Sequence, residues 1–166
     1  MPPAPVKKNP DQTWEHYDLW VRVKELLQTL NVHFKTDINV KGLNVTDIYS
    51  VGSLFSKVVE AQVVEILNGL RELWDPDNSY VDYMFVNQGQ TFPDVILVDR
   101  LDKTKILMGI ELKAWYLFSK EGEPSFRFTV TPEACAHADF IVITPWVLSD
   151  VITGTPRLLP PYVESA

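Results

Sequence analysis

Two apolar stretches decide the fold of this chain: Phe92-Pro93-Asp94-Val95-Ile96-Leu97-Val98-Asp99 and Ile106-Leu107-Met108-Gly109-Ile110-Glu111-Leu112-Lys113-Ala114-Trp115. Both are rich in the aliphatic and β-branched residues that favour strands. The connection between them, residues 101–105, is short, and short connections join antiparallel neighbours. The sequence therefore predicts a hairpin whose first strand opens with Pro-Asp and whose second strand carries Glu-Leu-Lys.

The second predicted strand separates charged from apolar side chains. Because side chains alternate along a strand, Glu111 and Lys113 share one face. The opposite face is apolar and carries Met108, Ile110, Leu112 and Ala114. An apolar face of this kind belongs against a core. If the hairpin pairs in the direct register, Asp94 comes near Glu111 and Lys113, so two carboxylates and one ammonium are expected at one place.

Helices are predicted before this hairpin. Apolar residues recur at helical spacing over residues 14–31 and again over 52–74, which is typical of amphipathic helices. Residues 32–50 between them are expected to form a loop with no more than a short strand. The turn cluster at 75–79 ends the second helix, and a strand is predicted at about 80–87.

After the hairpin the sequence predicts a further helix and strand. An alternating stretch at 126–130 predicts a short strand. Thr131-Pro132-Glu133 is a helix-start signal, so a helix is expected from there as far as Ala138. The apolar run at 140–143 is typical of a strand buried on both faces. From residue 52 onward the predicted order is helix, three strands, helix, strand.

Length and composition bound the domain count. A chain of 166 residues with a hydrophobic fraction of 46% suffices for one domain with its own core. We expect residues 1–12 to be a flexible tail, 13–155 to form the domain and 156–166 to be a C-terminal tail. The sequence carries no stopping signal after residue 162, so a truncated end is an open alternative.

The same composition bears on location. No apolar run approaches the roughly 20 residues that span a bilayer, so no membrane partner is expected. The N-terminus lacks the apolar segment of a signal peptide. Cys135 is the single cysteine, which excludes an internal disulfide and fits a reducing compartment. A cytoplasmic protein is therefore expected.

The net charge of −7 argues at first against a nucleic-acid partner. The charge is unevenly distributed, however, because residues 91–128 contain six acidic and six basic residues. This region is neutral, and a bound divalent ion would make it locally positive. The overall charge therefore does not exclude DNA.

The charged residues of the hairpin suit metal-assisted hydrolysis. Carboxylate oxygens are hard ligands, and Mg²⁺ prefers one or two of them together with water and phosphate oxygens. Such an ion activates water and neutralises charge on a phosphate under attack. An ammonium at Lys113 would orient or deprotonate that water, or stabilise the pentacovalent phosphate.

Pro93-Asp94, sixteen intervening residues and Glu111-Leu112-Lys113 together resemble the motif of the PD-(D/E)XK nuclease superfamily, which includes many type II restriction endonucleases. The common core of that family is a helix, three antiparallel strands, a helix and a fourth strand, which is the order predicted over residues 52–146. The resemblance implies an α/β fold of restriction-endonuclease type, with a mixed central sheet flanked by helices.

The resemblance also implies roles for individual residues. Asp94 and Glu111 would be metal ligands and Lys113 the catalytic lysine. Members often add an acid from the helix before the first strand, for which Glu60 and Glu65 are both candidates, and we favour Glu60. The implied activity is Mg²⁺-dependent hydrolysis of double-stranded DNA, with Mn²⁺ as an alternative ion, by a homodimer.

Other interpretations stay open. Pro-Asp at a strand start and Glu-x-Lys on a strand also occur on plain solvated faces, and a nuclease fold can serve as a non-cleaving DNA-binding or assembly module. A ribonuclease H-type site would use Asp94, Glu111 and Asp139 instead. Cys135 and His137 are too isolated from other thiols and imidazoles to predict a zinc site.

Overall fold

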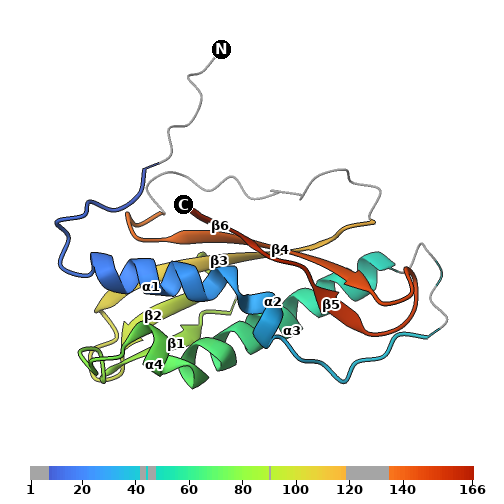
Figure 1. Cartoon of the computed structure of the whole chain (residues 1–166), viewed down its shortest axis with the longest axis horizontal. Coiled ribbons are helices and arrows are strands. Elements are labelled where there is room, and N and C mark those ends of the chain that lie inside the picture. The colour runs from blue at the N-terminus through green and yellow to red at the C-terminus, as the bar shows by residue number, and fades with distance from the viewer. Residues whose placement is uncertain (1–7, 42–43, 45–47, 90, 119–134) are drawn as a thin grey trace, which may run out of the picture.

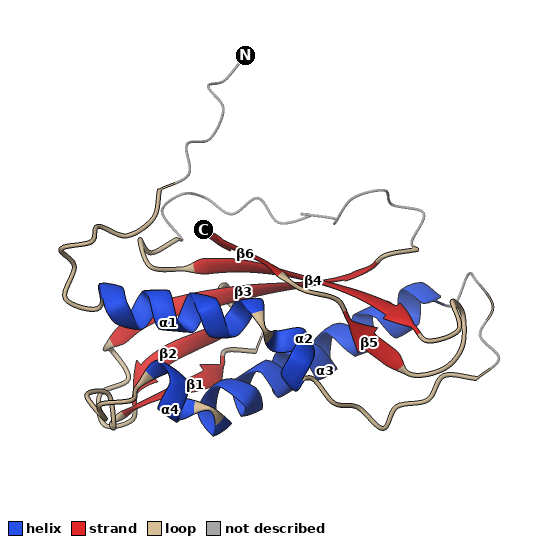
Figure 2. Ribbon diagram, viewed as in Figure 1, coloured by secondary structure: helices blue, strands red, loops and turns tan. Residues whose placement is uncertain are grey.

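Figure 1 shows the computed structural model of the chain, which describes residues 8–41, 44, 48–89, 91–118 and 135–166. These residues form a mixed α/β fold in which helices flank a curled, mixed sheet (Figures 1 and 2). The apolar side chains of the two long helices join one core with those of a single sheet face. The coarse α/β prediction is therefore confirmed.

The helices agree with the predicted amphipathic segments, although each segment is divided. The first becomes α1 (Tyr17–Gln28) and α2 (Leu30–His33), and the second becomes α3 (Ile48–Gly69) and α4 (Arg71–Trp74). Thr29 separates the first pair because its hydroxyl donates to the carbonyl of Leu26 at 2.9 Å, a side-chain bond that competes with continued helix. None of these helices is long and apolar enough to cross a bilayer.

The strands follow the order β1-β2-β3-β4-β5, and β6 also pairs with β4. Their bounds are Tyr83–Asn87 (β1), Val95–Asp99 (β2), Ile106–Tyr116 (β3), Phe140–Leu148 (β4), Pro156–Leu158 (β5) and Tyr162–Ser165 (β6). The first three strands are antiparallel, as predicted, whereas β3 and β4 are parallel. Parallel neighbours require a long connection, and residues 117–139 provide it.

The predicted C-terminal tail at 156–166 was wrong. These residues form β5 and β6, and both pair antiparallel with β4. Leu158 and Val163 are buried and belong to the core. The N-terminal tail is also less free than expected, because Pro10 is buried and the carbonyl of Lys8 accepts a hydrogen bond from Ser165 at 2.8 Å. Residues 1–7 lie outside the described part.

The predicted helix ending at Ala138 was wrong over its described residues. Residues 135 and 136 have no regular secondary structure and 137–138 form a turn, so none of the four is helical. The carboxylate of Asp139 accepts the backbone N–H of Ala136 at 2.8 Å, and such local side-chain bonds favour turns over helix. The predicted strand at 126–130 and the helix start at 131–133 lie outside the described residues.

Packing of α3 against the sheet in the core positions the charged residues of the hairpin. Val59, Val63 and Leu67 of α3 are buried together with Met108 and Ile110 of β3. These two β3 residues belong to the face predicted to be apolar. Glu111, which lies between Ile110 and Leu112, therefore points to the opposite face.

Candidate functional site

The β2–β3 register brings Asp94 to Glu111. Val95 pairs with Ile110, so the next antiparallel position places Asp94 opposite Glu111. Oδ2 of Asp94 accepts the backbone N–H of Leu112 at 2.8 Å, which holds the carboxylate against β3. The predicted juxtaposition of Asp94 with the Glu-Leu-Lys segment is confirmed.

Lys113 and Glu111 form an ion pair on their shared face of β3. The ammonium of Lys113 donates a hydrogen bond to Oε1 of Glu111. Glu111 is 7% exposed and Lys113 is half-buried. A carboxylate at this depth requires a charged partner or hydrogen bonds, and Lys113 supplies both.

The helix α3 adds a second ion pair. Glu60 is buried, with 6% of its surface exposed, and its Oε2 lies 2.7 Å from the ammonium of Lys57. Glu65, the other predicted candidate, is exposed. Of the two, Glu60 is therefore the acid enclosed by the fold, whereas the carboxylate of Glu65 is hydrated at the surface.

Electrostatics link this helical pair to the strands. The pKa of Lys57 is raised chiefly by its hydrogen bond to Glu60, and the charges of Glu60, Asp94 and Glu111 raise it further, while desolvation acts against them. The charges of the two strand acids thus act on Lys57 from the hairpin. We call Asp94, Glu111 and Lys113 the carboxylate cluster.

Burial perturbs the protonation of Asp94. Loss of solvation raises the pKa of this carboxyl above 3.8, and the charge of Glu111 adds to the rise. The Leu112 N–H and the ammoniums of Lys113 and Lys57 act in the opposite direction without cancelling it. The charged form of Asp94 is therefore energetically unfavourable where it lies, and a divalent cation beside it would stabilise it.

This shift predicts a pH dependence of stability. Because the folded protein holds the Asp94 proton more tightly than the unfolded chain, the contribution of Asp94 to the free energy of unfolding is fully present below pH 3.8. It is lost as the pH rises through the higher folded pKa. A ¹³C NMR titration of the side-chain carboxyls measures this, with the carboxyl of Asp102 as an internal control.

Asp102 is partly exposed, with 43% of its side chain accessible, and hydrogen bonds from the side chain and backbone of Thr104 lower its pKa. We therefore expect Asp94 to titrate at a higher pH than Asp102. The reverse order would contradict the burial of Asp94.

The donor set suits a hard divalent ion that completes its shell with other ligands. Among the described residues, no group of three or more His, Cys, Asp or Glu is arranged to hold an ion by itself. Asp94 and Glu111 nevertheless offer two adjacent carboxylates, and Mg²⁺ is commonly held by one or two of these together with water and substrate phosphate. The chemistry of the residues present therefore fits such an ion.

Asp139, the third acid of the ribonuclease H-type alternative, is already engaged. Its Oδ1 accepts the N–H of Gly109 at 2.6 Å and its Oδ2 accepts that of Ala136. Asp139 is buried, and these bonds fasten the start of β4 to β3. Because both oxygens of Asp139 accept backbone N–H groups, this residue does not support a ribonuclease H-type site.

Two interactions near the candidate site were not predicted from the sequence. Lys57 was not singled out, although its spacing of three residues from Glu60 is typical of a helical ion pair. The bond between Asp139 and Gly109 has no local signal, because 30 residues separate the partners.

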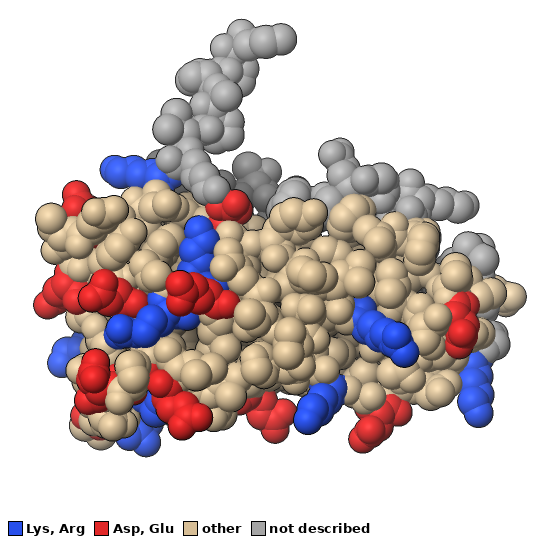
Figure 3. All heavy atoms as spheres, in the orientation of Figure 1, with Lys and Arg blue, Asp and Glu red and all other residues tan. Residues whose placement is uncertain are grey.

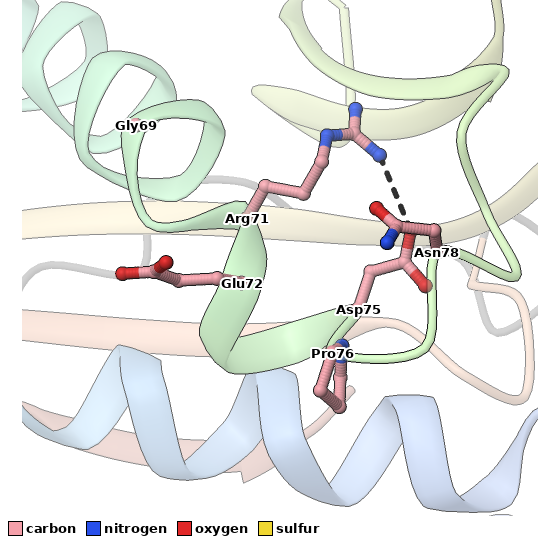
Figure 4. Close-up of a pocket in the computed structure, with 6 residues that line it drawn as sticks. All are labelled: Gly69, Arg71, Glu72, Asp75, Pro76 and Asn78. Atoms are coloured by element: carbon pink, nitrogen blue, oxygen red, sulfur yellow. Dashed lines mark hydrogen bonds and ion pairs between the residues drawn. The ribbon is translucent and has the colours of Figure 1, made fainter.

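A surface hollow of about 350 Å³ lies elsewhere, where α3 meets α4 (Figure 4). It is lined by Gly69, Arg71, Glu72, Asp75, Pro76 and Asn78. Arg71 and Asp75 point toward each other, with Nη1 and Oδ2 3.5 Å apart (Figure 4). Arg71 also donates to the carbonyl of Tyr80 at 2.9 Å, and Asp75 accepts the N–H of Ser79 at 2.7 Å. These groups hold the loop before β1.

The chain matches no family model, no curated protein and no solved structure with which it was compared.

Proposed function

We propose that this chain is a metal-dependent endonuclease that hydrolyses phosphodiester bonds of DNA, with a restriction-endonuclease-like core of the PD-(D/E)XK type. The observation that carries the proposal is the meeting of Asp94 with Glu111 and Lys113 on adjacent antiparallel strands. The order α3, β1, β2, β3 and a parallel β4 is consistent with that core. The second helix of the core would fall in residues that lie outside the described part.

In this proposal Asp94 and Glu111 hold Mg²⁺, or Mn²⁺ in its place. When bound, the ion would supply an activated water and neutralise charge on the phosphate. Lys113, paired with Glu111 on the same strand face, would orient the attacking water and stabilise negative charge that develops in the transition state. Glu60 supports the site from α3.

Double-stranded DNA as substrate and a homodimer as the active form follow from the resemblance. Lysine and arginine side chains mix with acidic ones on the face drawn in Figure 3, which carries α1. A DNA backbone favours a continuous basic surface. We therefore expect DNA to approach the carboxylate cluster from another side of the molecule.

Cleavage of supercoiled plasmid tests the proposal. The parent protein should convert it to nicked and linear forms with Mg²⁺ or Mn²⁺ and should leave it intact with EDTA. Lys113→Met, prepared identically, should cut about a hundredfold more slowly, because it lacks the ammonium that assists the water. Binding of DNA by the parent without any metal-dependent cutting would favour the non-cleaving module instead.

A further inference from the structure

The sheet face of the carboxylate cluster, which we call the site face, continues beyond β3. Lys113 pairs with Ile143 of β4, and Ile143 pairs with Tyr162 of β6, so Tyr162 lies in line with Lys113 on the same face. Val147, four residues further along β4, pairs with Arg157 of β5 and places it on this face too. The two C-terminal strands therefore extend the site face beside β4 (Figure 2).

The exposure of β5 and β6 follows this alternation. Tyr162 is 66% exposed and Arg157 is exposed, whereas Leu158 and Val163 point to the other face and belong to the core. Within the described strands, Lys113 and Arg157 are the only cationic residues, and both lie on the site face. The site face thus offers a phenol and a guanidinium to a ligand beside the candidate site.

We propose that Tyr162 and Arg157 bind the phosphate backbone of the DNA strand that the carboxylate cluster cleaves. This inference rests on the proposed function, because it takes DNA as the substrate. Arginine and tyrosine side chains are common donors to phosphate oxygens, and such contacts determine the position of a protein on the duplex. The carboxylate cluster itself carries two negative charges against one positive charge, so attraction to DNA without a bound ion must come from outside it.

The spacing of these residues suits one strand of DNA. Adjacent strands of a sheet lie about 4.8 Å apart, which places Tyr162 about 10 Å from Lys113, across Ile143. Arg157 lies four residues further along the sheet, roughly 16 Å from Lys113. A DNA strand carries one phosphate for about every 3.4 Å of helix axis. Tyr162 would therefore reach a phosphate about three nucleotides from the one at Lys113, and Arg157 one about five nucleotides away.

The acidic residues of the site face lie at one end of this arrangement. Glu111 and Glu164 both lie opposite Ile141, so the two acids share a row across the sheet. Lys113 and Tyr162 form the next row along β3 and β6. We therefore expect the DNA backbone to follow the donors of the site face, away from Glu164.

The test is the affinity for a short, fluorescently labelled DNA duplex, measured by anisotropy in EDTA so that no divalent ion contributes. Arg157→Gln should weaken binding about tenfold, because a charged contact to phosphate is lost. It should also lower the slope of log affinity against log salt concentration by about one, since one counterion fewer is released. Tyr162→Phe removes only the hydroxyl, and should weaken binding about threefold with an unchanged salt slope.

Matched variants on other surfaces are the controls. Lys103→Gln removes one positive charge from the β2–β3 turn, where Lys103 is exposed at the end of the hairpin remote from Asp94. Tyr17→Phe removes one hydroxyl from α1, which packs against the apolar face of the sheet through the stacking of Trp20 on Phe140. Each control should change the DNA affinity by less than about twofold and leave the salt slope unchanged.

Melting curves and cleavage kinetics distinguish a DNA contact from a change in the fold. Both variants substitute exposed side chains and should melt within about 2 °C of the parent. With Mg²⁺ they should raise the KM for DNA and leave kcat within about twofold, because a contact to a distant phosphate is the same in the ground state and the transition state. Arg157→Lys keeps the charge and should retain the parent salt slope.

The inference is overturned if either Arg157→Gln or Tyr162→Phe binds DNA as tightly as its control, or if the parent does not bind the duplex. Its failure is distinct from failure of the proposed function. A parent protein that cuts plasmid, with no effect of the two substitutions on DNA affinity, refutes these contacts alone. The expected losses of affinity in a protein that binds DNA but never cuts it refute the nuclease alone.

Discussion

Asp94→Asn is expected to slow Mg²⁺-dependent DNA cleavage about 10³-fold, which corresponds to ~4 kcal/mol of transition-state stabilisation. An amide of the same shape can still accept the Leu112 N–H that holds the side chain at 2.8 Å, but it lacks the negative charge that binds a metal ion. Initial rates on supercoiled plasmid, at saturating Mg²⁺, measure the effect.

The same substitution should not destabilise the fold. Burial raises the pKa of Asp94, so at neutral pH the ionised carboxylate opposes folding. A neutral amide removes that cost, and we expect an equal or higher melting temperature in the absence of metal. Loss of activity with retained stability is typical of a residue kept for function.

Glu65→Gln is the matched control for Asp94→Asn. Glu65 is an exposed acid on α3, and its substitution also removes one negative charge. Its cleavage rate should stay within about twofold of the parent rate. An Asp94→Asn protein that cuts as fast as Glu65→Gln would show that Asp94 is not part of the active site.

Gly109→Ala should lower the free energy of unfolding by about 3 kcal/mol. A Cβ at this position would lie 2.2 Å from Cγ of Pro93 and 2.8 Å from Oδ1 of Asp139. The backbone N–H of Gly109 donates to that same oxygen, so any shift that relieves the overlap also disturbs the bond between β3 and the start of β4. Urea denaturation monitored by circular dichroism gives the value.

Gly69→Ala provides the comparison. No atom lies within 4 Å of a Cβ built at Gly69, the last residue of α3. Alanine there should be neutral or stabilise the protein by up to about 1 kcal/mol, because it favours helix over the unfolded chain. Equal stabilities of the two variants would contradict the close packing described around Gly109.

The hairpin could be predicted because its signals are local. Alternating side chains separate Glu111 from Ile110, and a short turn joins the strands. The register shift between Leu97 and Val98, which places Asp94 opposite Glu111, was not predicted. The long helices could be predicted equally well, since an apolar stripe at helical spacing is a property of one segment alone.

The C-terminal strands could not be predicted in the same way. Pro156, Pro160 and Pro161 suggest a linker, because proline lacks the donor that a central strand needs. In the structure Pro156 begins β5, and the other two lie between β5 and β6. This segment becomes strand only because β4 offers it backbone partners, which a local pattern does not contain.

The sequence by itself determined the strand faces and the pairing of the two strands in a hairpin, because both depend on residues close together in the chain. The register that places Asp94 opposite Glu111 depends on the shift between Leu97 and Val98, which only the tertiary structure decided. Tertiary structure alone decided which helical acid is enclosed, since Glu60 and Glu65 differ only in what packs around them. It also decided that the charges of Asp94 and Glu111 act on Lys57 and that Asp139 holds Gly109. These interactions link segments far apart in the chain, and only the packing of α3 and β4 against β3 creates them.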